Sequence, residues 1–282
     1  DGQGLMMKVF VLGLLGARIA LSSASSRTPQ VSSLRITADL SLSVEQEFTD
    51  AEEGSVLWDA SRLLLAYVAA SSDSIVKAKR IIEIGSGTGV VGLALARLGA
   101  SSVVVTDKAS QLQLMRRNVQ HNRPLCCNDR CKECSWIGSV DVCSLTWGEA
   151  WKQETPELAA PKQFDLIVCC DCVYPTCSPA PLADVLLDLL DINPEASMLL
   201  AAEYRPPPAM AAEAGIDHVQ TFFTIMRGAC EISRVEVPRE WQCDEISLWM
   251  IRHVDSYNPP TTAAGATARA RSRRQARGYA AQ

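Results

Sequence analysis

A glycine-rich stretch, EIGSGTGVVG, occupies residues 83–92, between an apolar run and a segment with a helical pattern. Gly85, Gly87 and Gly89 let the backbone turn sharply and approach a ligand closely. The helix that follows offers free amide groups to an anion. The stretch therefore predicts a site for a nucleotide-like cofactor.

A nicotinamide-binding fold is the alternative interpretation of this stretch. Gly87 to Gly92 match the spacing G-x-G-x-x-G, and Asp107 lies 20 residues beyond Gly87, as a dinucleotide fingerprint requires. That fingerprint opens directly at the exit of a strand, which here is Gly85. Counted from Gly85, Val90 stands where the third glycine belongs, and this disfavours the nicotinamide alternative.

A second stretch, FDLIVCCDCVYP, covers residues 164–175 and ends an apolar run with an acid, Asp171. A phenol, Tyr174, follows three residues later. Such side chains at the exit of a core strand indicate either a ligand site or a structural role. In the structural alternative, Asp171 caps a helix and Tyr174 packs in the core.

Short apolar runs alternate with amphipathic stretches along the chain, which is typical of βαβ units. Strands are expected at residues 81–84, 102–107, 139–145, 165–170, 197–203, 232–237 and 247–254. Helices are expected at 59–70, from the glycine stretch to about 98, from 108 to about 122, at 180–190 and at 209–226. Alternating apolar residues over 34–44 predict an N-terminal hairpin or edge strand.

These elements predict an α/β fold with a doubly wound, mostly parallel seven-stranded sheet that helices cover on both faces. Only about nine residues separate the last two strands, so we expect the last strand to pair antiparallel. In such sheets the ligand crevice opens where the strand order reverses, at the carboxyl ends of the strands. The strands that end at Gly85 and near Asp171 should flank this point, so Asp171 and Tyr174 are expected to face the reacting end of the cofactor.

The glycine stretch and the acid that ends the second strand resemble the motifs of the class I, seven-stranded S-adenosylmethionine-dependent methyltransferases, which have a Rossmann-like fold. The resemblance implies S-adenosyl-L-methionine as the cofactor, with the glycines on its methionine part. It also implies that Asp107 accepts hydrogen bonds from both ribose hydroxyls, which suits a charged carboxylate. A solubilising acid at a strand end is the alternative for Asp107. Glu83 is expected to help by ordering the loop.

Further segments narrow the resemblance to the family-16 protein-lysine methyltransferases. They lie within residues 54–225 and read GSVLWDASRLLLAYV, LMRRNVQHN, LTWGE, DCVYP and AAEYR, with FF further on. The resemblance implies that Trp58 and Trp147 border the cofactor pocket, and core packing is the alternative for each. The chain departs from the family's L-D-W-G at Thr146, which offers only a hydroxyl on the adenine side.

The same resemblance places Asp171 and Tyr174 on a D-x-x-Y motif that receives the substrate lysine. A neutral amine must attack the methyl group, and deprotonating a lysine of pKa about 10.4 costs about 4.6 kcal/mol at pH 7. A nearby anion stabilises the ammonium, so Asp171 is expected to capture and orient the amine rather than to act as a strong base. Tyr174 is expected to hydrogen-bond and to contact the incoming cation. No catalytic metal is expected.

The expected function is thus methyl transfer from S-adenosyl-L-methionine to a lysine side chain of a protein. A methyltransferase that acts on a small molecule or on another residue type is one alternative. A non-catalytic binding module that keeps the fold is another. Cys172 and Val173 stand where adenine and cytosine amino-methylases have prolines, which disfavours a base substrate.

Charge is distributed unevenly over the 282 residues, of which 48% are hydrophobic and 21% charged. The formal net charge is −5, but residues 256–282 hold five arginines and no acid, so the remainder carries −10. This balance disfavours a nucleic-acid-binding core. Between Asp39 and Asp59 lie seven acids and no lysine or arginine, which indicates either a solvated acidic surface or a contact for a basic partner.

Eleven cysteines, several in apolar runs, indicate a reducing compartment rather than a disulfide framework. The cluster CCNDRCKEC spans residues 126–134. A four-ligand zinc site could be built there from Cys127, Cys131 and Cys134 with Cys126 or His121. Because the spacing is tight and irregular, a loop with free thiols is the alternative, and no metal is assigned.

Three regions are expected along the chain. Residues 1–30 form a disordered extension or a targeting segment, since their apolar stretch is too short to span a bilayer. Residues 31–255 form the methyltransferase domain, and residues 256–282 a disordered basic tail. We expect a monomeric, cytoplasmic protein with no nucleic-acid or membrane partner; a nuclear location and organelle targeting by residues 6–30 stay open.

Overall fold

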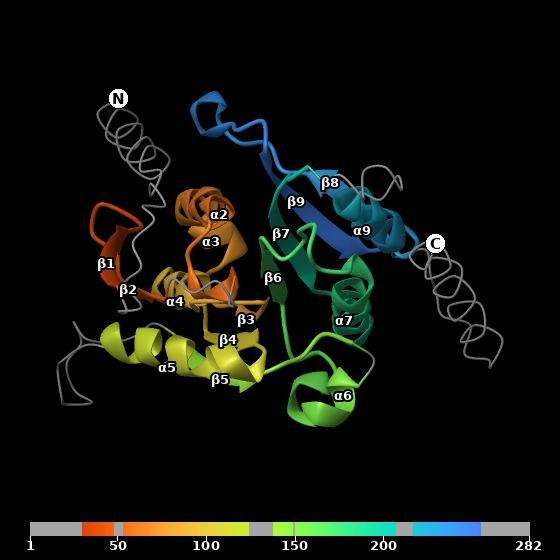
Figure 1. Cartoon of the computed structure of the whole chain (residues 1–282), viewed down its shortest axis with the longest axis horizontal. Coiled ribbons are helices and arrows are strands. Elements are labelled where there is room, and N and C mark those ends of the chain that lie inside the picture. The colour runs from red at the N-terminus through yellow and green to blue at the C-terminus, as the bar shows by residue number, and fades with distance from the viewer. Residues whose placement is uncertain (1–29, 48–52, 124–137, 149, 207–216, 255–282) are drawn as a thin grey trace.

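The computed structural model describes most of the middle of the chain (Figure 1). The described ranges are residues 30–47, 53–123, 138–148, 150–206 and 217–254. The expected terminal regions 1–30 and 256–282 and the cysteine cluster 126–134 therefore lie wholly or almost wholly outside them. In the described ranges, no helix combines the length and apolar character needed to cross a membrane.

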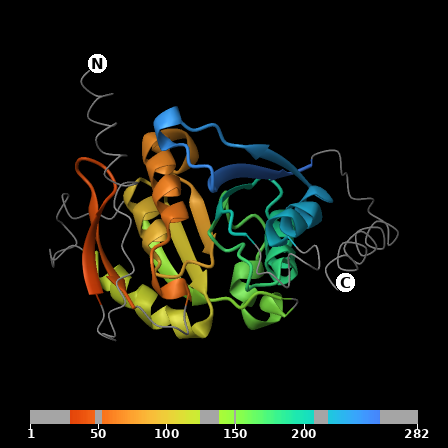
Figure 2. The same ribbon diagram turned by 45° about the horizontal axis from the view of Figure 1, so that its top comes forward.

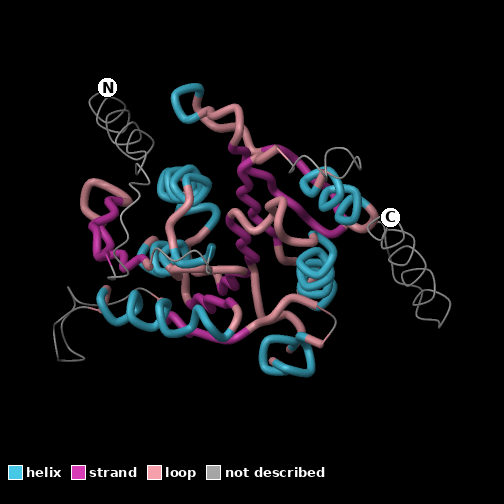
Figure 3. Tube along the Cα trace, viewed as in Figure 1, coloured by secondary structure: helices cyan, strands magenta, loops and turns pink. Residues whose placement is uncertain are grey.

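Seven strands form one sheet in the order β5-β4-β3-β6-β7-β9-β8 (Figures 1 and 3). They are β3 (Arg80–Ile84), β4 (Ser102–Asp107), β5 (Ser139–Ser144), β6 (Leu166–Cys170), β7 (Ser197–Glu203), β8 (Cys230–Arg234) and β9 (Ile246–His253). The pairs from β5 to β7 are parallel, and β9 runs antiparallel to both β7 and β8. The predicted α/β fold with an antiparallel last strand is confirmed.

Helices cover both faces of this sheet (Figures 1 and 2). One face packs against α2 (Asp59–Ala70), α3 (Ser72–Ile75), α4 (Val90–Arg97) and α5 (Leu112–His121). The other packs against α6 (Trp151–Glu154), α7 (Pro179–Ile192) and α9 (His218–Arg227). Short 3-10 turns are η1 (Glu53–Ser55), η2 (Ala109–Gln111), η4 (Pro156–Ala159) and η5 (Arg239–Trp241).

Successive side chains of the central strands point to opposite faces of the sheet, so the core consists of two layers. In β3, Ile81 belongs to the layer under α2 and α4, whereas Ile82 belongs to the layer under α7 and α9. All five residues of β6 are buried. A strand covered on both faces needs such a continuous apolar run, and this is why LIVCC could be recognised as a central strand.

One strand differs from the expected one: the expected strand 232–237 starts and ends earlier, as β8 (Cys230–Arg234). Of the expected helix 209–226, residues 209–216 lie outside the described ranges, and the described part is α9. The Asp217 side chain accepts a hydrogen bond from the Gln220 amide at 2.9 Å and caps α9. An aspartate at this position satisfies an amide that otherwise lacks a partner in the first turn.

The predicted N-terminal hairpin is confirmed as β1 (Gln30–Arg35) and β2 (Ser41–Gln46), which pair antiparallel in a sheet of their own. Asn118 of α5 and Asn122, the residue that caps the end of α5, hold it. The Asn118 side chain accepts from the Glu45 amide at 2.7 Å and donates to the Glu45 carbonyl at 3.0 Å. Asn122 binds both backbone groups of Ser43 in the same way, at 2.8 and 2.7 Å.

The spacing of this contact follows from the two backbone geometries. Four residues along a helix advance about 6 Å, and two residues along a strand advance nearly 7 Å. Asn118 and Asn122 on the helix therefore stand opposite Glu45 and Ser43 on the strand. Each carboxamide takes the place of a neighbouring strand, because it offers one acceptor and one donor to a single residue.

Candidate active site

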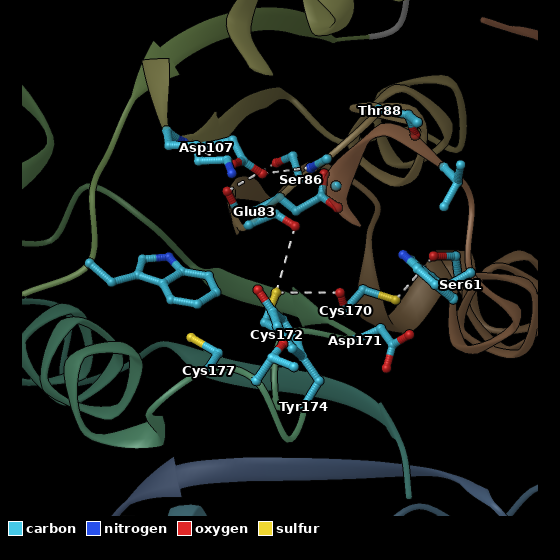
Figure 4. A pocket seen from close by; sticks show the side chains of 18 of the residues that line it. Ser61, Glu83, Ser86, Thr88, Asp107, Cys170, Asp171, Cys172, Tyr174 and Cys177 are labelled. Carbon is cyan, nitrogen blue, oxygen red and sulfur yellow. Dashed lines mark hydrogen bonds between the residues drawn. The ribbon is translucent and has the colours of Figure 1, made fainter. Parts of the chain in front are cut away.

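A cavity of about 800 Å³ opens at the carboxyl ends of β3, β4 and β6 (Figure 4). It lies where β3 and β6 are neighbours and their following helices, α4 and α7, cover opposite faces of the sheet. Such a reversal of strand order is where doubly wound sheets bind ligands. Of the residues predicted for the site, all but Gly89 line the cavity: Trp58, Glu83, Gly85, Gly87, Asp107, Trp147, Asp171 and Tyr174.

The glycine loop approaches its surroundings too closely for side chains. Gly85 has a φ of +67°, and an added Cβ would lie 2.5 Å from the Cys172 sulfur and 3.0 Å from the Trp147 ring. Gly87 has a φ of +54°, and its Cβ would lie 2.5 Å from the Gly54 carbonyl oxygen. Gly89, also with positive φ, is the N-cap of α4 and lies behind the cavity lining. At Gly85 and Gly87 the loop thus presents bare backbone to the cavity.

Asp107 stands at the end of β4 and closes against this loop (Figure 4). Its Oδ2 accepts a hydrogen bond from the Gly87 amide at 2.8 Å, and its Oδ1 accepts one from the Lys108 amide at 2.8 Å. An ionised carboxylate can accept about four hydrogen bonds. Asp107 therefore fixes the loop and places its carboxylate at the cavity wall.

Glu83 lies under the loop and is almost fully buried, with 1% of its surface exposed. Its Oε2 accepts a hydrogen bond from the Gly92 amide in the first turn of α4 at 2.8 Å. Burial raises the pKa of Glu83 to about 8, although the hydrogen bonds from Gly92 and Ser86 act in the opposite direction. The side chain ties β3 to the start of α4, which is the place where a loop-ordering residue is needed.

The two predicted tryptophans lie at different depths of the cavity. Trp147 is partly buried and its ring faces Gly85. Trp58, the N-cap residue of α2, is 38% exposed. The guanidinium of Arg205 lies over the Trp58 ring, with its Cζ 4.9 Å from the ring centroid. Neither tryptophan is a simple core residue.

Asp171 follows β6 in a left-handed conformation, with a φ of +56°. Such a conformation is uncommon for residues other than glycine, and it concentrates at functional sites. Its amide still donates to the Ala201 carbonyl at 2.8 Å, so the strained residue is held by β7. Asp171 does not cap α7, whose N-cap is Ser178, and the helix-cap alternative is therefore wrong.

Arg205 is the main partner of Asp171 and was missed by the sequence reasoning. Its guanidinium binds both carboxylate oxygens, with Nη1 at 3.1 Å from Oδ1 and Nη2 at 2.6 Å from Oδ2. Nη2 also donates to Glu203 at 2.6 Å, and the Glu203 amide donates to Asp171 Oδ1 at 3.3 Å. The sequence contained one indication of this contact. Glu203 ends the strand next to β6, so its side chain had to lie at the same edge of the sheet as Asp171.

Thiols lie between the glycine loop and the loop after β6. The Cys172 sulfur donates to the carbonyls of Ile84 and Gly85, at 3.3 and 3.6 Å. Hydrogen bonding with Cys169 and burial raise its pKa well above the ordinary range, which makes it a packing group rather than a nucleophile. The seven cysteines of the described ranges are all free, and these ranges contain no group of three or more metal-ligating side chains.

Comparison with models of known protein families identifies one that matches this chain. A family model described as lysine methyltransferase matches residues 36–227. The chain belongs to the lysine methyltransferase family. The match runs from the hairpin to the end of α9 and includes every predicted site residue.

Individual relatives agree with membership of the lysine methyltransferase family. The chain is 33% identical over 151 residues to protein N-lysine methyltransferase METTL21A of Danio rerio, which covers 54% of this chain and 62% of that protein. It is 31% identical over 118 residues to EEF1A lysine methyltransferase 3 of Mus musculus, covering 42% and 43% of the two chains. The chain thus spans less than two thirds of the length of these relatives.

A solved structure shares the fold. The Thermus thermophilus 16S rRNA N2 G1207 methyltransferase RsmC, in complex with AdoMet and guanosine, superposes with a TM-score of 0.50 at 14% identity. The match covers 82% of this chain and 52% of that one. This likeness supports the doubly wound methyltransferase fold for this member of the lysine methyltransferase family.

Proposed function

We propose that this chain transfers a methyl group from S-adenosyl-L-methionine to a lysine side chain of a protein. One observation carries the proposal: the glycine loop with its closely approached Gly85 and Gly87, Asp107, and a carboxylate–phenol pair border the same cavity. Family membership and the names of the METTL21A and EEF1A relatives support a lysine substrate. The AdoMet in RsmC supports the cofactor.

The residues present fit such a cofactor. The cavity of about 800 Å³ is in the range of small-molecule sites. The bare loop at Gly85 and Gly87 allows close approach of a flexible polar chain, and the carboxylate of Asp107 suits two adjacent hydroxyls. Trp147 supplies a flat apolar wall for a ring. When bound, the cofactor supplies an electrophilic methyl group.

The chain's own part in catalysis is alignment of the acceptor amine. Asp171 and Tyr174 come from the loop after β6, on the side of the cavity opposite Asp107 (Figure 4). The carboxylate orients the amine, and the phenol adds a hydrogen bond and an aromatic face. The proton on the lysine nitrogen leaves to solvent before attack, because neither side chain is placed as a strong base.

The remaining expectations belong to this proposal as well. We propose a lysine-bearing protein as the partner, a monomeric and cytoplasmic enzyme, and no nucleic-acid or membrane partner. The acidic balance outside residues 256–282 supports the exclusion of nucleic acid.

Labelling tests the proposed reaction. The purified chain is incubated with a cell lysate and S-adenosyl-L-methionine carrying a labelled methyl group, and modified residues are identified by mass spectrometry. We expect label on lysine. Asp171→Asn and Tyr174→Phe should each reduce the rate by about 100-fold, the cost of a misplaced acceptor.

Glu231→Gln is the matched control, because Glu231 is exposed on β8, away from the cavity. It should leave the rate unchanged. Label found only on other residue types, or an Asp171→Asn enzyme as active as the wild type, would refute the proposal.

A further inference from the structure

Arg205 is held in the cavity by two carboxylates and an aromatic ring. It binds Asp171 through both oxygens and Glu203 through one, and it lies on the Trp58 ring. The Asp171 side chain is 2% exposed, and the Arg205 side chain 26%. A planar guanidinium fits a carboxylate with two parallel bonds, which an ammonium cannot do.

This arrangement opposes displacement of Arg205 by an incoming amine. Removal of one partner of a buried ion pair leaves an uncompensated charge and is strongly unfavourable. Burial lowers the pKa of Arg205, but the hydrogen bonds and charges of Asp171 and Glu203 outweigh it, so the net pKa is raised. Arg205 therefore stays charged at neutral pH.

Several charges lie around Arg205 and Asp171 behind the acceptor end of the cavity. They include Glu203 at the end of β7, and Asp59 in the first turn of α2, which forms an ion pair with Arg62 at 3.5 Å. Burial, followed by repulsion from Asp171 and Asp59, raises the pKa of Glu203 despite the proximity of Arg205. Two carboxylates, Asp171 and Glu203, thus contact the one guanidinium of Arg205.

The other titratable groups lie further around the lining. Tyr174 and Cys177 are on the loop after β6, and Cys170 and Cys172 lie at the end of that strand. Burial is the main cause that raises the pKa of Cys170. Glu83, Asp107 and Lys108 line the glycine-loop side.

We propose that Arg205 is the counter-ion that lets the acceptor amine lose its proton inside the complex. This inference rests on the proposed lysine methylation. An unpaired Asp171 would stabilise the ammonium form and raise the pKa of the bound lysine. With Arg205 on both of its oxygens, Asp171 still orients the amine, while the guanidinium favours release of the proton to water. Arg205 is a positioning residue, because it acts through Asp171.

A pH profile of the single-turnover rate tests this role, since the rate within the complex reports the pKa of bound groups. In Arg205→Met, the acid limb should shift upward by about one to two pH units, the size of one lost charge a few ångströms away. The rate at pH 7 should fall about 10- to 100-fold and recover as the pH rises. KM for the protein substrate should not increase.

Two further variants separate this role from a structural one. Arg205→Lys keeps the charge and should restore the wild-type position of the acid limb. Glu203→Gln removes a negative charge and should shift the limb downward, and it tests the proposal even where Arg205→Met fails to fold. A pH-independent loss in Arg205→Met, a faster Arg205→Met enzyme at pH 7, or an unmoved limb in Glu203→Gln would overturn the proposal.

A binding measurement distinguishes failure of this inference from failure of the proposed function. The probe is n-butylammonium, titrated by NMR at pH 7 into the chain saturated with S-adenosylhomocysteine. Arg205→Met should bind the cation about 10-fold more tightly than the wild type, and equal affinities would contradict the inference. A wild-type chain that methylates no lysine refutes the proposed function, whatever this comparison gives.

Discussion

At the scale of single residues, Glu83 shows how one buried carboxylic acid can affect the whole protein. Its pKa is about 8 in the folded chain, against an ordinary value of 4.5. Between these values the folded protein holds one proton more than the unfolded chain does at this residue. The contribution of Glu83 to the free energy of unfolding therefore decreases as the pH rises through this interval.

Replacement by glutamine removes this dependence, because an amide does not titrate. Relative to Glu83→Gln, the free energy of unfolding of the wild type should fall by up to ~1.4 kcal/mol per pH unit between pH 5 and 8. Urea denaturation of both proteins across this range measures the difference. Glu231→Gln on exposed β8 should leave the slope unchanged, and parallel curves for wild type and Glu83→Gln would show that Glu83 keeps its ordinary pKa.

The residues of the site could be predicted to different degrees. Asp107 and Asp171 were recognisable because each ends an apolar run, and parallel strands end at one edge of the sheet. Arg205 was not recognised, although Glu203 marked the same edge of the sheet, because it follows β7 by two residues and its partner depends on how the chain leaves the strand. The left-handed backbone of Asp171 could likewise not be predicted from the sequence, because the position holds neither a glycine nor an asparagine.

At the scale of elements, the contact between the hairpin and α5 reaches the glycine loop. Asn118 Nδ2 donates not only to Glu45 but also to the Thr88 carbonyl at 2.9 Å. Arg117 forms ion pairs with Glu45, at 2.8 Å, and with Glu47. Part of the acidic segment between Asp39 and Asp59 is thus used inside the protein, against a basic stretch of α5.

Truncation of Asn118 should therefore affect both stability and ligand binding. Asn118→Ala leaves three backbone groups without their partner and should cost about 3 kcal/mol of unfolding free energy. It should also weaken binding of S-adenosylhomocysteine, because Thr88 borders the cavity. Gln120→Ala, exposed on the same helix, should stay within about 0.5 kcal/mol of wild type. Equal stability of the two variants would contradict a role for the asparagine contact.

The elements themselves were largely predictable, and the exceptions have physical reasons. Continuous apolar runs located the central strands, and strict alternation located the hairpin. β8 was placed too late because the edge strand is only partly buried, so its apolar pattern is weak. The side chain of Asp217 caps α9, and residues 209–216 of the expected helix lie outside the described ranges.

At the scale of the whole molecule, the two halves of the sheet meet at the cavity. The glycine loop belongs to the half built from β3 to β5, and Arg205 with Glu203 to the half that continues through β7. A ligand that spans the cavity would contact both halves. Such a ligand stabilises the folded state in proportion to the logarithm of its concentration.

Thermal unfolding with two adenosine-containing ligands tests this coupling and the choice of cofactor. At about 100 times its Kd, S-adenosylhomocysteine should stabilise the chain by about 2.7 kcal/mol, or roughly 5–10 °C. NAD should produce no shift. Asp107→Asn should need about 10- to 100-fold more ligand for the same shift, whereas Asp141→Asn, exposed on β5, should not. Stabilisation by NAD alone would favour the nicotinamide alternative.

The position of β9 between β7 and β8 has a consequence for biosynthesis. While the ribosome is still making the last part of the sheet, β7 has its partner β6 on one edge and nothing of its own chain on the other. The strand that will fill this edge emerges roughly 40 residues later, after a few seconds of translation. During that interval a nascent chain exposes an apolar strand edge, and a chaperone that shields it until β9 arrives would prevent pairing between neighbouring chains.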